Sequence, residues 1–155
     1  MLLARYFAQR SYDYEAASTR LRALMEREGL PYDRGEKTYN SRLAQELAVW
    51  AVEKRGVEDI HGGLFRAYFV ERKDVSDPRE LIAVAASVGL DPEETEAVLT
   101  ERRFRYRVDE DWALSRHLGV TGVPTFAIGG RGVVGAQPYE ALEALAVEAG
   151  VPRRS

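Results

Sequence analysis

The 155 residues contain no cysteine, so we first consider the histidines and carboxylates as side chains that could do chemistry. The lack of cysteine excludes disulfides, thiolate metal sites and thiol nucleophiles within this stretch. The two histidines, His61 and His117, lie far apart, and neither has a second ligand-type residue three or four positions later. We therefore expect both histidines on the surface or at a helix cap. We predict no metal, no cofactor and no catalytic side chain in this sequence.

The charge pattern argues against nucleic acid. The formal net charge is −3, and the one basic run with interleaved aromatics, Arg102 to Arg107, is followed at once by three acidic residues at 109–111. An exposed helix face with an Arg107–Asp111 ion pair explains this run without a ligand. No segment approaches 18 consecutive apolar residues, and the first residues lack the apolar stretch of a leader. We expect a cytoplasmic protein that binds neither nucleic acid nor membrane.

The segment that points to a function is Gly122-Val123-Pro124-Thr125. A proline directly before a predicted strand, preceded by Gly-Val, meets the local needs of a cis X–Pro turn, because proline tolerates the cis bond and glycine has a permissive backbone. The backbone of Val123 would then form a short unpaired edge for an extended peptide. Alternatively, the proline merely ends the loop and keeps this edge from unwanted pairing.

The elements before residue 119 are predicted to be helices, delimited by Gly and Pro. Amphipathic spacing predicts helices over 13–28, from Asn40 or Ser41 to about Gly56, over 57–71 and over 104–118. Asp77-Pro78 and Asp91-Pro92 each combine an N-cap with proline at the first helical position, which predicts two further helix starts. We expect one apolar core in these helices, and its large side chains are predicted to be Trp50, Phe65, Tyr68, Leu81 and Trp112.

The sequence after Gly119 predicts a hairpin and a last helix. Thr125–Ile128 and Arg131–Val134 flank Gly129-Gly130, a strong two-residue hairpin signal, and a helix is expected after Pro138. The chain is therefore mainly α with a small β part. Two strands alone are marginally stable, so the first strand must pack on helices or pair across subunits, which leaves a homo-oligomer open.

Several of these segments resemble one family. Gly122-Val123-Pro124-Thr125 resembles the cis-proline loop of the thioredoxin superfamily, and the stretch from Gly119 to Glu140 is similar to the FrnE-type branch of DsbA-like proteins. Tyr39–Ala44 and Leu64–Phe69 resemble that branch's inserted helical domain. The 2-hydroxychromene-2-carboxylate isomerases and kappa-class glutathione transferases share this architecture, but the Gly-Ala-Gln-Pro sequence at 135–138 favours the FrnE-type branch. The resemblance implies a helical insertion domain over 1–118 and the C-terminal β-β-α part of a thioredoxin-like fold over 119–155.

The family's first β-α-β unit, which carries Cys-x-x-Cys, has no counterpart in this sequence, so we interpret the chain as a truncated or degenerate form. The resemblance implies a DsbA-like thiol–disulfide oxidoreductase lineage that is redox-inactive without its thiols. A peptide or thiol substrate would bind at Gly122, Val123, Pro124 and Thr125. Two alternatives stay open: a non-catalytic peptide- or glutathione-type binding module that uses this loop, and a helical fragment completed by a partner chain.

Overall fold

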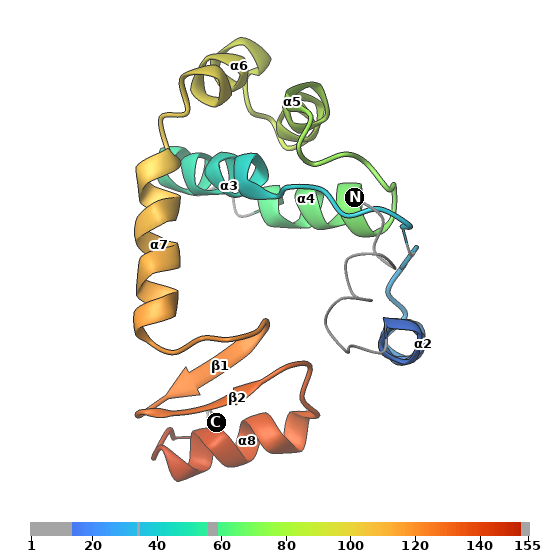
Figure 1. Ribbon diagram of the computed structural model, residues 1–155, viewed down its shortest axis with the longest axis vertical. Helices are drawn as coiled ribbons and strands as arrows, with labels where there is room; N and C mark the ends of the chain where they lie inside the picture. Colours follow the sequence, from blue (N-terminus) through green and yellow to red (C-terminus); the bar gives the residue numbers. More distant parts are fainter. Residues whose placement is uncertain (1–13, 34, 56–58, 153–155) are drawn as a thin grey trace. The chain divides into compact units, whose positions relative to one another are not determined.

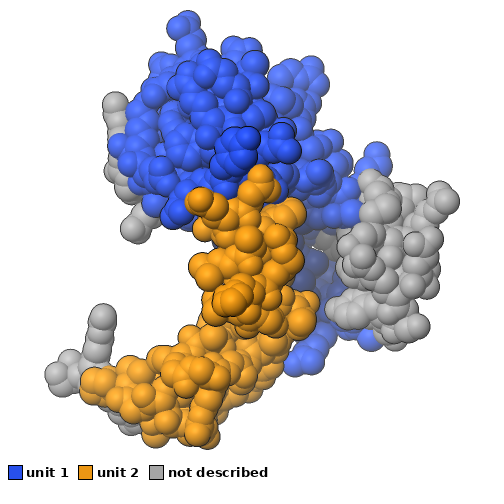
Figure 2. Space-filling view, turned by 60° about the vertical axis from the view of Figure 1, so that its left-hand side comes forward, with its two compact units in different colours: residues 1–108 blue, residues 109–155 orange. Residues whose placement is uncertain are grey.

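The computed structural model describes residues 14–33, 35–55 and 59–152 (Figure 1). Residue contacts divide the chain into two compact units, Met1–Val108 and Asp109–Ser155, which Figure 2 colours separately. This division falls inside one helix, whereas the sequence resemblance implies a domain boundary after residue 118, which stays a prediction. No helix in the described ranges has the length and apolar character needed to span a membrane.

The fold is mostly helical with one two-stranded sheet, as the sequence predicts. Every predicted element is present within a few residues of its predicted bounds. The helix start predicted at Val57 falls in 56–58, outside the described residues. In chain order the elements are α2 (Tyr14–Arg27), α3 (Arg42–Arg55), α4 (Asp59–Phe69), α5 (Pro78–Ser87), α6 (Pro92–Glu101), α7 (Arg105–His117), β1 (Thr125–Ile128), β2 (Arg131–Val134) and α8 (Tyr139–Glu148).

The two predicted aspartate caps begin α5 and α6. The Asp77 carboxylate accepts a hydrogen bond from the Arg79 N–H at 2.9 Å, and the Asp91 carboxylate accepts one from the Glu94 N–H at 2.8 Å. Each aspartate satisfies one of the backbone donors that a helix start leaves without an intrahelical partner. These local contacts set where both helices begin.

Helices α3 to α6 enclose the core of the first unit. Trp50 and Leu81 are buried in it, and Tyr68 packs against it, as predicted. The core lies between helices because each of them presents one apolar stripe to its neighbours. Its fully buried apolar side chains are Leu47, Ala51, Ile60, Leu81 and Ala85.

Two predicted core residues are on the surface. Phe65 is 62% exposed, because the inner face of α4 is formed by Ile60 and Ala67, and Phe65 lies well round the helix from both. Trp112 is 43% exposed, so the prediction that it is buried is wrong. Val108 is the last buried residue of α7, and the rest of that helix belongs to the second unit.

An ion pair between a buried carboxylate and a part-exposed arginine joins α3 to the end of α6. The Glu46 carboxylate, which is almost fully buried, accepts two hydrogen bonds of 2.7 Å from the Arg102 guanidinium and one of 3.2 Å from Arg42 Nε. Burial raises the pKa of Glu46, but the hydrogen bonds and positive charges of Arg102 and Arg42 outweigh it and hold this pKa below its usual value. The bidentate geometry fixes Arg102, which caps α6 with a left-handed backbone.

The second unit consists of most of α7, the hairpin and α8. Strands β1 and β2 are antiparallel, with Thr125 opposite Val134 and Ile128 opposite Arg131. Arg131 Nη1 lies 2.5 Å from Glu148 Oε2, which fastens the turn end of the hairpin to the last turn of α8. None of the residues 109–152 is buried, in contrast with the core of the first unit.

Candidate functional site

The predicted substrate-binding residues form the loop that enters β1. Gly122, Val123 and Pro124 precede the strand, and Thr125 is its first residue. The Val123–Pro124 peptide bond is cis. The Val123 side chain is 88% exposed, so it contributes almost nothing to packing in this unit. An exposed apolar residue on a loop held by a strand is available to a ligand.

Two hydrogen bonds hold the loop in place, and a third fastens the end of β2 beside it. The Thr125 hydroxyl donates to the Gly122 carbonyl at 2.6 Å, and the Gly135 N–H donates to the Pro124 carbonyl at 2.7 Å. The Gln137 side-chain amide donates to the Val134 carbonyl at 2.7 Å. The Gly-Ala-Gln-Pro sequence therefore has a structural role that the sequence alone did not reveal, since two of its residues fasten the end of β2 next to the loop.

Two glycines near the loop serve different purposes. Gly135 has a φ of +89°, a left-handed conformation in which a side chain would be strained. Gly122 does not adopt a positive φ; a Cβ atom there would lie 3.1 Å from Val134 Cγ1. The reason for Gly122 therefore lies in its close approach to the Val134 side chain on β2, and not in a left-handed backbone.

The outer edge of β1 presents unpaired backbone groups. In an antiparallel pair, alternate residues direct their N–H and C=O groups at the partner strand. Since the Pro124 carbonyl bonds to Gly135, the register turns Phe126 and Ile128 towards β2. The backbone groups of Thr125 and Ala127 then point to the opposite edge. The sheet has two strands within the described ranges, so no strand of this part of the chain pairs with that edge.

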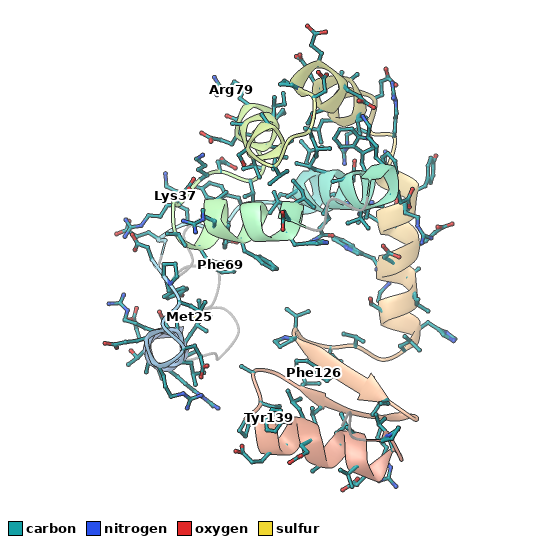
Figure 3. All side chains as sticks on the ribbon, turned by 180° about the vertical axis from the view of Figure 1, so that it is seen from behind. Met25, Lys37, Phe69, Arg79, Phe126 and Tyr139 are labelled. Atoms are coloured by element: carbon teal, nitrogen blue, oxygen red, sulfur yellow. The ribbon has the colours of Figure 1, made fainter. Side chains whose placement is uncertain are left out.

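One face of the hairpin also lacks cover. The face that carries Ile128 and Arg131 lies against α8, because Arg131 pairs with Glu148 and Ile128 is half-buried. The opposite face carries Ala127, Gly132 and Val134, which are all exposed. Figure 3 shows Phe126 on the hairpin and Tyr139 at the start of α8. The hairpin therefore offers a free strand edge and a flat face of small side chains.

The loop can bind but has no group for acid–base or nucleophilic chemistry. Its side chains are apolar apart from the Thr125 hydroxyl, which already donates to Gly122. His61 and His117 are exposed, as predicted, and lie on other elements, α4 and the end of α7. Among the described residues no three His, Asp or Glu side chains gather as a metal site would require. Backbone pairing with an extended segment is the interaction that this geometry supports.

Comparisons with known proteins agree on one family. Residues 11–146 match the model of the DSBA-like thioredoxin domain. Over 81 residues, 52% of this chain, the sequence is 30% identical to the thiol:disulfide interchange protein DsbA of two Pseudomonas aeruginosa strains, and the match spans 38% of those proteins. A crystal structure of a probable DsbA oxidoreductase from Streptomyces coelicolor superposes with a TM-score of 0.77 at 29% identity, over 96% of this chain and 67% of that one.

Proposed function

This chain belongs to the family of DSBA-like thioredoxin domains, and we propose that it is the substrate-binding part of a thiol–disulfide oxidoreductase. Thiol–disulfide exchange proceeds by attack of a thiolate, and these 155 residues contain no sulfur nucleophile. We therefore place the reactive thiols in a β-α-β unit outside this sequence. By itself, the chain would bind substrate without turnover.

The observation that carries this proposal is the open hairpin. A two-stranded hairpin is marginally stable in water, and this one has no further strand at either outer edge, that of β1 included, and one face without cover within the described residues. The backbone groups of Thr125 and Ala127 are spaced to pair with one more strand. The small side chains of Ala127 and Gly132 leave room for a helix to pack closely. A β-α-β unit supplies both a strand and a helix.

The loop itself would then hold the substrate. The exposed Val123 lies two residues before the first residue of β1, close to where an incoming strand would place its end. In the family that the sequence resembles, the residue before the proline pairs its backbone with the substrate, and Val123 matches that position. The finer assignment to the FrnE-type branch is supported by Gly135 and Gln137, which belong to the Gly-Ala-Gln-Pro sequence and position this loop.

Amide hydrogen exchange tests the proposed completion of the sheet. In the 155-residue chain, we expect the Thr125 and Ala127 amides to exchange fast and the Phe126 and Ile128 amides to exchange slowly, because only the second pair faces β2. A fusion that places a thioredoxin-type β-α-β unit with Cys-x-x-Cys ahead of residue 1 should slow exchange at Thr125 and Ala127. Unchanged exchange at these two amides in a folded fusion would contradict the proposal.

Turnover tests the role of the loop. The fusion should reduce insulin faster than its β-α-β unit alone, whereas the 155-residue chain should show no activity above a buffer blank. Val123→Glu should lower turnover of the fusion by roughly tenfold, since a charge would replace the apolar contact next to the substrate backbone. Val151→Glu, at an exposed valine after α8, is the matched control and should leave turnover unchanged.

A different result is expected if the chain is a binding module without chemistry. In that case, the 155-residue chain would capture an extended peptide or glutathione at the loop, and Val123→Glu would abolish the capture. The fusion would be no more active than its added unit. The observation that favours this second function is the absence of cysteine from the present sequence.

A further inference from the structure

Helix α4 is apolar on two opposite faces. Ile60 and Ala67 face the core, whereas Phe65 and Phe69, on the other side, are 62% and 38% exposed. A helix with apolar residues on two opposite faces is normally covered on both of them. Phe69 also contacts the rings of Tyr32 and Tyr68, so it is held in place, while Phe65 projects further into solvent.

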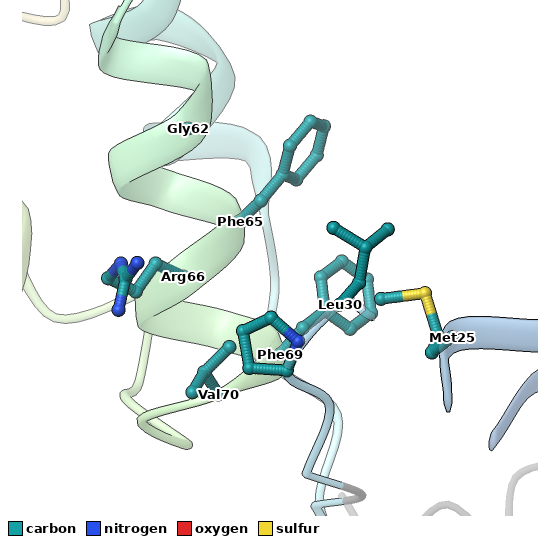
Figure 4. Close-up of a pocket in the computed structure, with 8 residues that line it drawn as sticks. Met25, Leu30, Gly62, Phe65, Arg66, Phe69 and Val70 are labelled. Carbon is teal, nitrogen blue, oxygen red and sulfur yellow. The ribbon is translucent and has the colours of Figure 1, made fainter. Parts of the chain in front are cut away.

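A groove runs along this outer face of α4. It has a volume of about 450 Å³, and Figure 4 shows the residues that line it. The segment after Leu30 and Pro31, which line the groove opposite α4, is held by two contacts. The Asp33 N–H donates to the Phe69 carbonyl at 2.7 Å, and Arg72 pairs with Asp33. The groove is therefore a built feature of the first unit. Its apolar lining includes Met25, Leu30, Pro31, Phe65, Phe69 and Val70.

Gly62 forms part of the groove and opens it to close approach. A Cβ atom at Gly62 would meet nothing within 4 Å, whereas one at the neighbouring Gly63 would lie 3.1 Å from Val84 Cγ1. Core packing therefore accounts for Gly63 but leaves Gly62 without a structural reason. A glycine inside a helix lowers its stability relative to alanine, so its presence in the groove is consistent with a ligand that lies against the backbone.

Arg66 adds one positive charge to the lining. Its side chain is exposed and makes no ion pair with any described residue, although most of the other arginine side chains described in this unit do. Phe65 and Arg66 leave the helix in different directions and so flank the groove (Figure 4). None of the described residues that line the groove is a carboxylate. An apolar surface with a single cation is complementary to an apolar ligand that bears one negative charge.

We propose that this groove binds an extended peptide segment that presents apolar side chains next to an acidic residue. From Gly62 to Val70 the helix rises about 12 Å, which matches three or four residues of extended chain. Phe65 is exposed, so the groove is open to solvent on that side, and an extended peptide can pass along it. A second copy of this protein fits less well, because two-fold pairing of the α4 faces would place two Arg66 side chains in one interface, and no lining residue of the groove is acidic and could pair with them.

Fluorescence anisotropy on the 155-residue chain tests this proposal without any thiol chemistry. The probe is a dye-labelled hexapeptide, amidated at its C-terminus, with a leucine and a phenylalanine flanking an aspartate. Two matched probes carry asparagine or lysine in place of the aspartate. We expect the aspartate peptide to bind about tenfold more tightly than the asparagine peptide, and the lysine peptide to bind most weakly. Equal binding of all three peptides would contradict the role of Arg66.

Three substitutions locate the binding in the groove. Phe65→Ala should weaken binding of the aspartate peptide at least about tenfold, and Tyr106→Ala, at another exposed aromatic residue, should not. Arg66→Glu should reverse the preference and favour the lysine peptide. Gly62→Leu should fill the groove and abolish binding while the helix stays folded, since leucine has a higher helix propensity than glycine.

Three outcomes would overturn the proposal. One is failure of the aspartate peptide to bind to the folded chain. Another is binding that Gly62→Leu leaves intact, which would place the peptide elsewhere. The third is a dimer in analytical ultracentrifugation that Phe65→Ala dissociates, in the absence of peptide binding, which would assign the groove to a second copy. Each outcome is independent of whether the fusion with a thiol-bearing unit is active.

Discussion

The two units of this protein differ in how completely their side chains are buried and their backbone hydrogen bonds are paired. The first surrounds a core of fully buried side chains, whereas none of the residues 109–152 in the second is buried. The physical reason lies in the backbone. A helix satisfies its hydrogen bonds internally and needs only apolar neighbours, which α3 to α6 provide for one another. A strand leaves a row of N–H and C=O groups unpaired at any edge without a partner, and β1 has a partner strand at one edge only within the described residues.

The two tryptophans give the largest expected contrast between the units. Trp50→Ala should cost roughly 3–5 kcal/mol of unfolding free energy, because Trp50 is only 5% exposed and its removal leaves a cavity. Trp112→Ala should cost less than about 1.5 kcal/mol, because much of this side chain is already in contact with water. Urea denaturation followed by circular dichroism measures both. A similar loss for the two variants would mean that the second unit is as tightly packed as the first.

Removal of the Glu46 charge, which pairs with Arg42 and Arg102, should have an intermediate effect on stability. The pH dependence of this effect should show that it comes from the charge. Glu46→Gln should cost roughly 1.5–3 kcal/mol at pH 7, because it removes the charge that strengthens the hydrogen bonds of this buried carboxylate, while the part-exposed Arg102 can regain water. The folded-state pKa of Glu46 is below its ordinary value of 4.5, so the pair stabilises the protein above that pH. This contribution should disappear as the pH falls through the lower, folded-state pKa.

Denaturation of wild type and Glu46→Gln between pH 3 and pH 7 measures this difference. The gap between the two proteins should be constant above about pH 5 and close below it. Glu101→Gln is the control, because Glu101 pairs with Arg103 at 2.6 Å on the surface, where solvent screens the charges. A gap that persists unchanged at the lowest pH would show that packing, and not charge, is what Glu46 contributes.

Substitution of the adjacent glycines of α4 should have the smallest effect on stability. The two positions compare an open and a packed face of one helix. Gly62→Ala should raise the unfolding free energy by roughly 0.5–1 kcal/mol, because the new methyl group meets open space and alanine favours the helix. Gly63→Ala should be less stable than Gly62→Ala, since its methyl group would press on Val84 in the core. Thermal unfolding of the two variants tests this order. The reverse order would place the packed face of α4 on the side of Gly62.

Local signals in the sequence determined the elements. Asp77 and Asp91 cap their helices through their own side chains, and Gly129-Gly130 turns the hairpin, so each boundary depends on residues that are neighbours in the chain. The family resemblance likewise drew on short segments such as Gly122–Thr125. These features could be predicted because the physical cause of each lies within a few residues of its effect.

Only the tertiary structure decided which apolar surfaces are covered. Phe65 and Trp112 have the residue type of a core, yet their burial depends on whether another element packs over them, and none of the described elements does so fully. The close approach of Gly122 to Val134 and the contacts of Gly135 and Gln137 join residues on different strands and turns. Periodicity reports the spacing of apolar residues along one helix or strand. It carries no information about what lies opposite, because burial is a property of two surfaces and the sequence pattern describes one.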